Sequence, residues 1–193
     1  MNIRAKLLTL LSIIATIVSA NQPSGMALAA SIVPVSNNDV GALVLAQAMV
    51  ADPATLVSAR FVAVPPSGTP HGTSDVLSFF PTHGATFGIL TSGSAPIADD
   101  ANTSGSSSYN NGGPALPGRG NAAFDVTILE INLTTPTGAN CLRLDFAFYS
   151  EEFPEYVGSV FNDAFIAELD RSTWVAGFTI QAPDNFALTK AVM

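Results

Sequence analysis

The chain has 193 residues, of which 48% are hydrophobic and 11% are charged, and its formal net charge is −8. This length predicts one domain, and the high apolar content excludes a largely disordered chain. With 7 basic against 15 acidic residues, the composition excludes a general nucleic-acid binder, because phosphate contacts require Lys and Arg. A single cysteine, Cys141, excludes an intrachain disulfide framework and a cysteine-based zinc cluster.

The first thirty residues are typical of an export signal. Arg4 and Lys6 precede an apolar run over 7–18, and small residues then predict cleavage near residue 20 or near 29–30. The run is shorter than the roughly 20 apolar residues of a membrane-spanning helix. We therefore expect a secreted or extracellular protein, free or associated with the cell surface, with no membrane span in the mature chain. The alternative interpretation is a buried core helix.

One helix is expected next, over about residues 39–51. Its apolar residues recur at near-helical spacing after Asp39, a candidate N-cap, and before Pro53, a stop signal. Short β-type segments bounded by turn residues follow. They predict strands at 55–64, 76–80, 85–91, 124–133, 141–149, 161–169 and 174–180. The expected fold class is mainly β, a β-sandwich or jelly-roll-like domain over 31–193 with one N-terminal helix after the signal peptide.

The segment Cys141–Tyr149 shows the clearest alternation in the chain. Leu142, Leu144, Phe146 and Phe148 fall on one face of a strand, and Cys141 falls on the other. This pattern predicts a strand half covered by a core. We expect Cys141 to be a buried, inert thiol rather than a nucleophile.

Residues 92–121 are rich in Gly, Ser, Asn, Pro and Ala. This composition predicts a long flexible surface loop. The alternative is a loop that orders around a ligand or a metal ion.

An acidic cluster follows the strand expected at 141–149. Three carboxylates within five residues repel one another unless a cation or hydrogen-bond donors compensate them. Calcium takes 6 to 8 oxygen ligands of the Asp, Glu, Asn and carbonyl type. The candidate calcium ligands are Glu151, Glu152, Asn162 and Asp163. The alternative is a solvated acidic turn, and no EF-hand spacing supports the metal site.

Catalysis has less support than binding in this sequence. There is no G-x-S-x-G, Walker A or H-E-x-x-H motif, and we expect His71 and His83 to be loop residues between Gly and Pro-rich turns. The rival to a non-enzymatic protein is a secreted glycoside-active enzyme or carbohydrate-binding module. It would use the carboxylates of Glu151, Glu152 or Asp163, and aromatic side chains such as Tyr156 or Trp174 would line its cleft.

The run Ser-Glu-Glu-Phe-Pro-Glu-Tyr at 150–156, followed by Phe-Asn-Asp-Ala-Phe at 161–165, resembles the choice-of-anchor L domain family, as does Gly-Ile-Leu-Thr-Ser-Gly at 88–93. The resemblance covers most of 38–187 and implies an exported bacterial surface protein. It implies no catalytic residue. The chain lacks a C-terminal anchoring signal and stops at Met193, where similar proteins continue with further strands, so we expect an incomplete domain. We expect a non-enzymatic adhesion or matrix role, with calcium as a stabilising ion and an extracellular protein or polysaccharide as partner.

Overall fold

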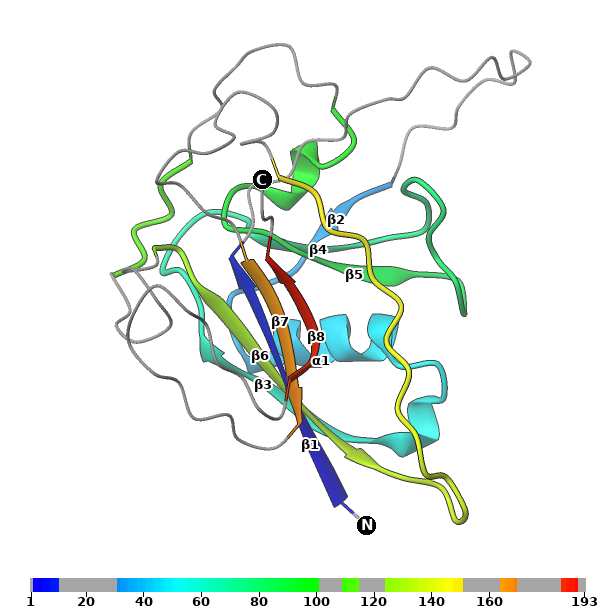
Figure 1. Ribbon diagram of the computed structural model, residues 1–193. Coiled ribbons are helices and arrows are strands. Elements are labelled where there is room, and N and C mark those ends of the chain that lie inside the picture. The colour runs from blue at the N-terminus through cyan, green and yellow to red at the C-terminus, as the bar shows by residue number, and fades with distance from the viewer. Residues whose placement is uncertain are drawn as a thin grey trace, which may run out of the picture.

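The computed structural model describes residues 2–10, 31–100, 109–114, 124–150, 164–169 and 185–190. Within these ranges the fold is mainly β, as predicted, with two sheets and one α-helix (Figure 1). The strands of the five-stranded sheet are, in order, β3 (Leu56–Ala63), β6 (Thr127–Thr134), β1 (Asn2–Leu10), β7 (Ala164–Leu169) and β8 (Asn185–Lys190). Every neighbouring pair in this sheet is antiparallel.

The second sheet is smaller and lies beside the first (Figure 1). Its order is β2 (Val33–Pro34), β4 (His71–Ser74) and β5 (Phe87–Leu90). The α-helix is α1 (Asp39–Met49), and two short 3-10 helices are η1 (Pro53–Thr55) and η2 (Ala95–Ile97). No helix in the described ranges is long and apolar enough to cross a bilayer.

Helix α1 confirms the helix expected at 39–51, but its N-cap is Asn38 rather than Asp39. The Asn38 side chain accepts a hydrogen bond from the Gly41 N–H at 3.1 Å, which satisfies one of the free donors of the first turn. Asp39 lies inside that turn, where a negative charge complements the helix dipole. Gly41 is required here because an added Cβ would collide with the carbonyl oxygen of Ser36.

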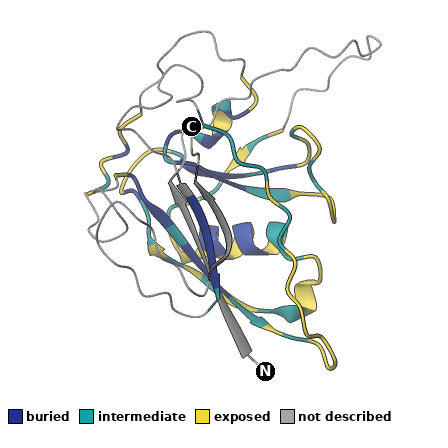
Figure 2. Cartoon of the chain, viewed as in Figure 1, coloured by how far each residue is buried: buried dark blue, intermediate teal, exposed yellow. Residues whose placement is uncertain are grey.

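The main core forms where α1 meets the five-stranded sheet. Ala42, Leu45 and Ala46 on one side of the helix are fully buried (Figure 2). They belong to one apolar cluster with Leu90, Leu129, Ile131, Phe165 and Ala167. Fully burying one such large side chain contributes about 1.5–3 kcal/mol. In β6 the odd-numbered residues Leu129 and Ile131 therefore face the core.

Strand β1 was not predicted as a strand. It lies between β6 and β7, and Leu7 is in register with Leu129 on one side and with Ala167 on the other. The structure therefore places residues 2–10 inside the sheet. The position of these residues in the sheet does not test whether they are cleaved during export, so the export signal stays a prediction.

The strand predicted at 141–149 is wrong, because these residues form no regular structure. The two sides of β6 are already paired, with β3 and with β1, so no ladder position beside β6 remains. The segment instead runs outside the sheet, past α1 and β5 (Figure 1). Cys141 is consequently exposed, which corrects the prediction of a buried thiol.

The remaining strand predictions have mixed outcomes. Those at 55–64 and 85–91 are confirmed with shorter bounds as β3 and β5, and that at 124–133 is confirmed as β6, which begins three residues later and ends one residue later. The described part of 161–169 is confirmed as β7. The segment at 76–80 is not a strand and makes one isolated bridge, between Leu77 and Phe80. The strand expected at 174–180 lies outside the described residues.

Candidate ligand-binding cavity

The predicted calcium ligands Glu151, Glu152, Asn162 and Asp163 lie outside the described residues, so the calcium hypothesis stays a prediction. The same holds for the aromatic residues proposed to line a sugar cleft, Tyr156 and Trp174. Among the residues that are described, no three His, Cys, Asp or Glu side chains gather where they could hold a metal ion.

His71 was expected in a loop, but it begins β4 and is fully buried. Its Nε2 lies 2.6 Å from Thr127 Oγ1 on β6, and its Nδ1 lies 3.2 Å from Asn37 Oδ1. The ring also stacks on Phe61 of β3, with ring centroids 4.6 Å apart. His71 therefore joins the small sheet to the large one.

The hydrogen bonds around His71 assign its tautomer. The Asn37 amide nitrogen donates to the carbonyl oxygens of Pro65 and Ser67, at 3.1 and 3.4 Å, so its Oδ1 faces the ring as an acceptor. His71 Nδ1 therefore donates, and Nε2 accepts from the Thr127 hydroxyl. Burial lowers the pKa of His71 to about 4, because the charged ring would lose its hydration. The neutral ring is thus a structural link between the sheets.

Part of the flexible loop expected at 92–121 is packed: Gly93, Ala95, Ala98 and Asn111 are buried, whereas Asp99, Asp100 and Tyr109 are exposed. Helix η2 brings Ala95 and Ala98 into a small buried cluster with Ile89. The Ala95 N–H donates to the Thr69 carbonyl at 2.8 Å. The first part of the expected loop therefore belongs to the body of the domain.

Asn111 and Asp125 hold residues 109–114 against the end of β5. Asn111 is 4% exposed, and its amide nitrogen donates to the carbonyl oxygens of Ser92 and Gly93 at 3.0 and 2.8 Å. The Asp125 carboxylate accepts the N–H groups of Asn111 and Gly113 at 3.2 and 2.7 Å. We call these two residues the Asn111–Asp125 anchor. No local sequence pattern indicates this anchor, since its hydrogen-bonded partners lie 12 to 19 positions apart.

A cavity of about 470 Å³ opens between the end of α1, strand β5, strand β6 and the irregular segment 139–149. Its wall is mostly apolar and includes Met49, Phe80, Phe87, Leu90, Leu144 and Phe148. Three of these side chains, Met49, Leu144 and Phe148, also pack against the main core. The volume lies within the range of small-ligand sites in proteins.

One corner of the cavity wall is polar. Arg143 Nε donates to Asp145 Oδ1 at 2.8 Å, and His83 Nε2 lies 4.0 Å from Asp145 Oδ2. Two hydrogen bonds to the carboxylate hold the pKa of Asp145 below its usual value. The bond from Thr82 has the larger effect, and the bond from Arg143 has the second largest. Asp145 is therefore an anion beside an exposed cation, and the group can orient a polar end of a ligand while the remaining wall binds its apolar part.

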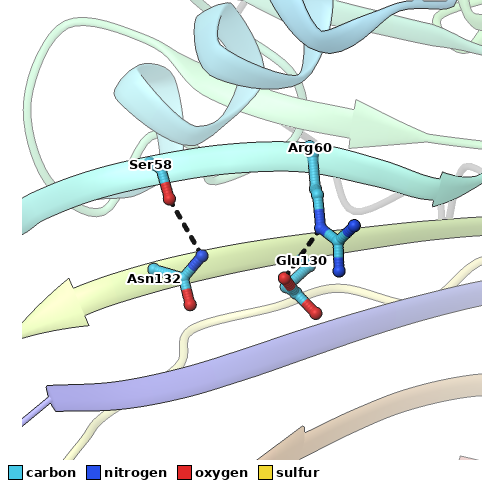
Figure 3. A network of polar contacts seen from close by, with 4 residues as sticks. All are labelled: Ser58, Arg60, Glu130 and Asn132. Atoms are coloured by element: carbon cyan, nitrogen blue, oxygen red, sulfur yellow. Dashed lines mark hydrogen bonds and ion pairs between the residues drawn. The ribbon is translucent and has the colours of Figure 1, made fainter.

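The opposite face of the sheet carries a second polar group, on β3 and β6. Arg60 Nε donates to Glu130 Oε1 at 2.9 Å, and Asn132 Nδ2 donates to Ser58 Oγ at 2.9 Å (Figure 3). The Glu130 side chain is only 5% exposed, whereas that of Arg60 is 57% exposed. The ion pair raises the pKa of Arg60, and it brings a cation to a buried carboxylate.

Comparison of the chain with protein-family models, with curated proteins and with solved structures found no match. The choice-of-anchor L resemblance therefore remains an expectation based on sequence motifs. Among the described residues, the cavity and its polar corner are the features whose volume and side-chain chemistry suit the binding of a ligand.

Proposed function

We propose that the protein is an exported, non-enzymatic adhesion domain, and that its cavity binds apolar groups of an extracellular partner. The observation that carries the proposal is the cavity of about 470 Å³ with its largely apolar wall. The sequence of residues 1–30 supports export. We further propose that the two sheets belong to a β-sandwich.

The chemistry of the wall favours a protein partner over a polysaccharide. A sugar brings many hydroxyl groups, and burying them against Met49, Phe80 and Phe87 would leave them without hydrogen bonds. Apolar side chains of a protein gain free energy in the same place. In the full chain, the corner formed by Arg143 and Asp145 provides one directional contact at the edge of the cavity.

The probe for this site is 1-anilinonaphthalene-8-sulfonate, an aromatic anion that combines an apolar body with one charged group. We expect saturable binding at one site of the full chain. Ala147→Trp adds bulk to the cavity wall and should weaken binding at least tenfold. Ala54→Trp makes the same change at an exposed position of η1 and should leave binding unchanged. Equal binding by the two variants would reject the cavity as the site.

Export is tested separately, by fusing residues 1–30 to a phosphatase that is active only outside the cytoplasm. We expect activity with the native segment and its loss when Leu7–Leu11 is replaced by charged residues, because the apolar run carries the export signal. Activity that survives this replacement would contradict the export proposal.

Calcium stabilisation is the remaining part of the proposal. Calcium at 100 times its dissociation constant should stabilise the folded chain by about 2.7 kcal/mol and raise its melting temperature relative to chelator. The double variant Glu151→Gln, Glu152→Gln should lose this shift, and Asp99→Asn, Asp100→Asn is the matched control. An identical melting temperature with calcium and with chelator would contradict a bound ion.

A further inference from the structure

The position that β1 occupies between β6 and β7 could also be occupied by a second segment of the same chain, Leu142–Ala147. β6 and β7 are both antiparallel to β1, so they run in one direction. The chain turns directly after β6, where the Ala139 N–H donates to the Pro136 carbonyl at 3.1 Å. A strand that follows β6 through a tight turn is antiparallel to it. Residues Leu142–Ala147 would therefore enter the space between β6 and β7 in the direction of β1.

The alternation of apolar and other side chains in Leu142–Ala147 matches the two faces of the sheet at that position. Leu142, Leu144 and Phe146 share one side of the segment, and the core side of β6 carries Leu129 and Ile131. The segment already lies against this side of the sheet. The rings of Phe146 and Phe165 of β7 are 5.0 Å apart, and Leu144 packs on the main core.

The charged residues favour one register for Leu142–Ala147 between β6 and β7. Lys6 of β1 is in register with Glu130 on β6 and with Glu168 on β7, which are 4% and 1% exposed. Arg60 of β3 is in register with Glu130 on the other side, so the row alternates in sign across four strands. Arg143 is the one cation in Leu142–Ala147 and the residue that can take the place of Lys6.

Arg143 in the place of Lys6 also gives the apolar residues suitable neighbours. Leu144 then lies opposite Leu129 and Ala167, and Phe146 lies opposite Phe165, the residue it already contacts. A slip by two residues would bring Asp145 between two buried carboxylates, and like charges directly opposite one another are destabilising. In this register Asp145 takes the place of Leu8, opposite Ile128 and Ile166, so the Arg143 charge and the contacts of Leu144 and Phe146 are what select the arrangement.

We propose that the space between β6 and β7 is a strand-binding site for which β1 and Leu142–Ala147 compete, so that removal of the N-terminal segment transfers Leu142–Ala147 into the sheet. The transfer takes one wall away from the cavity and exposes Met49, Phe80 and Phe87. This consequence rests on the proposed function: once export has removed β1, the partner would bind the uncovered apolar wall of Met49, Phe80 and Phe87 without the Arg143–Asp145 corner. The strand competition itself needs neither export nor a ligand.

Hydrogen exchange of the full chain tests the competition. Among the described residues, the amides of 142–147 make no backbone hydrogen bond, so they should exchange fast in the native sequence. Lys6→Glu places a third carboxylate in register with Glu130 and Glu168. We expect the amides of 142–147 to slow at least tenfold while those of 2–10 become fast, and Lys6→Arg should keep the native pattern. Unchanged exchange at 142–147, with β6 still protected, would overturn the proposal.

A second measurement leaves both competing strands intact, in case Lys6→Glu does not fold. A protease site between residues 20 and 30 releases β1 from the folded full chain, and Asn132→Cys supplies a partner for Cys141. In the proposed register these two residues are opposite, at a Cα distance that a disulfide spans. In the present structure Asn132 bonds to Ser58 on one face, whereas Cys141 lines the cavity on the other.

We expect the disulfide to form at least tenfold faster after cleavage than before it, and Cys141→Ser abolishes it as a control. Equal rates would overturn the proposal. The titration with 1-anilinonaphthalene-8-sulfonate is an independent readout, so a failure of ligand binding and a failure of strand exchange are distinguished.

Discussion

Strand β6 and the segment Cys141–Tyr149 have the same alternating pattern and different structures. β6 is paired on both sides, and its Leu129 is fully buried. In the second segment Leu142 remains 39% exposed and Phe146 37% exposed. Alternation therefore indicates which side chains share a face, but a strand forms only where a neighbouring ladder position is open.

The largest expected difference between the two regions comes from truncating one leucine in each. Leu129→Ala should lower the free energy of unfolding by about 2–5 kcal/mol, because it leaves a cavity in the core. Leu142→Ala should cost less than about 1 kcal/mol, since that side chain is partly in solvent. Urea unfolding curves measure both values. A loss at Leu142 equal to that at Leu129 would show that the irregular segment carries as much of the core.

Acid should act on β6 through His71. The unfolded ring binds a proton with a pKa near 6.5, whereas burial lowers the pKa in the folded protein to about 4. Between these values the unfolded state holds more protons, so the contribution of His71 is complete above pH 6.5 and is lost as pH falls toward 4. We expect a loss of about 3 kcal/mol over this range.

Urea unfolding at several pH values measures the effect of His71. Between pH 6.5 and 5 the carboxylates stay largely ionised, so this interval isolates the ring. His83→Gln changes an exposed histidine and should leave the slope unchanged. A flat profile in this interval would contradict a buried neutral His71.

A smaller effect is expected from the hydroxyl that bonds to this ring. Thr127→Val keeps the shape of the side chain but leaves His71 Nε2 without its donor, which costs about 1–3 kcal/mol in a buried site. Thr134→Val makes the same change at the exposed end of β6 and should stay within about 0.5 kcal/mol of the parent. Equal stabilities of the two variants would show that the hydrogen bond contributes nothing.

The smallest effect concerns reactivity and not stability. Cys141 is exposed, so a thiol reagent should label it in the folded full chain at nearly the rate seen in urea. In a Cys141→Ser background, Ala167→Cys places a thiol at a buried core position, and labelling there should require unfolding. Slow labelling of Cys141 would show that the segment 141–149 is covered.

The parts of the fold that the sequence predicted are those fixed by neighbouring residues. Helix α1 has near-helical apolar spacing and a capping residue, and β3, β5, β6 and β7 have compact β-type runs. The N-cap was predicted one residue too late, at Asp39, because the side chains of Asn38 and Asp39 are both suitable hydrogen-bond acceptors. Only the backbone shows that the Asn38 side chain reaches the Gly41 N–H.

The parts that it did not predict depend on distant residues. His71 is buried by Asn37 and Thr127, which lie 34 and 56 positions away, so its short strand between Gly and Pro residues gave no signal. β1 has an apolar run behind two cations, the same pattern that an export signal needs. Which of two suitable segments occupies the space beside β6 is decided by competition across the whole chain, and no local window contains it.

The Asn111–Asp125 anchor has a consequence for engineering. Asp125 accepts the N–H groups of Asn111 and Gly113, so the described residues on the two sides of the interval 115–123 are held at almost one point. The closure entropy of a chain segment between two fixed ends rises by only about 0.6 kcal/mol for each doubling of its length. A peptide tag or a small reporter inserted between these ends would therefore be tolerated, at a position remote in sequence from both strands that compete for the sheet.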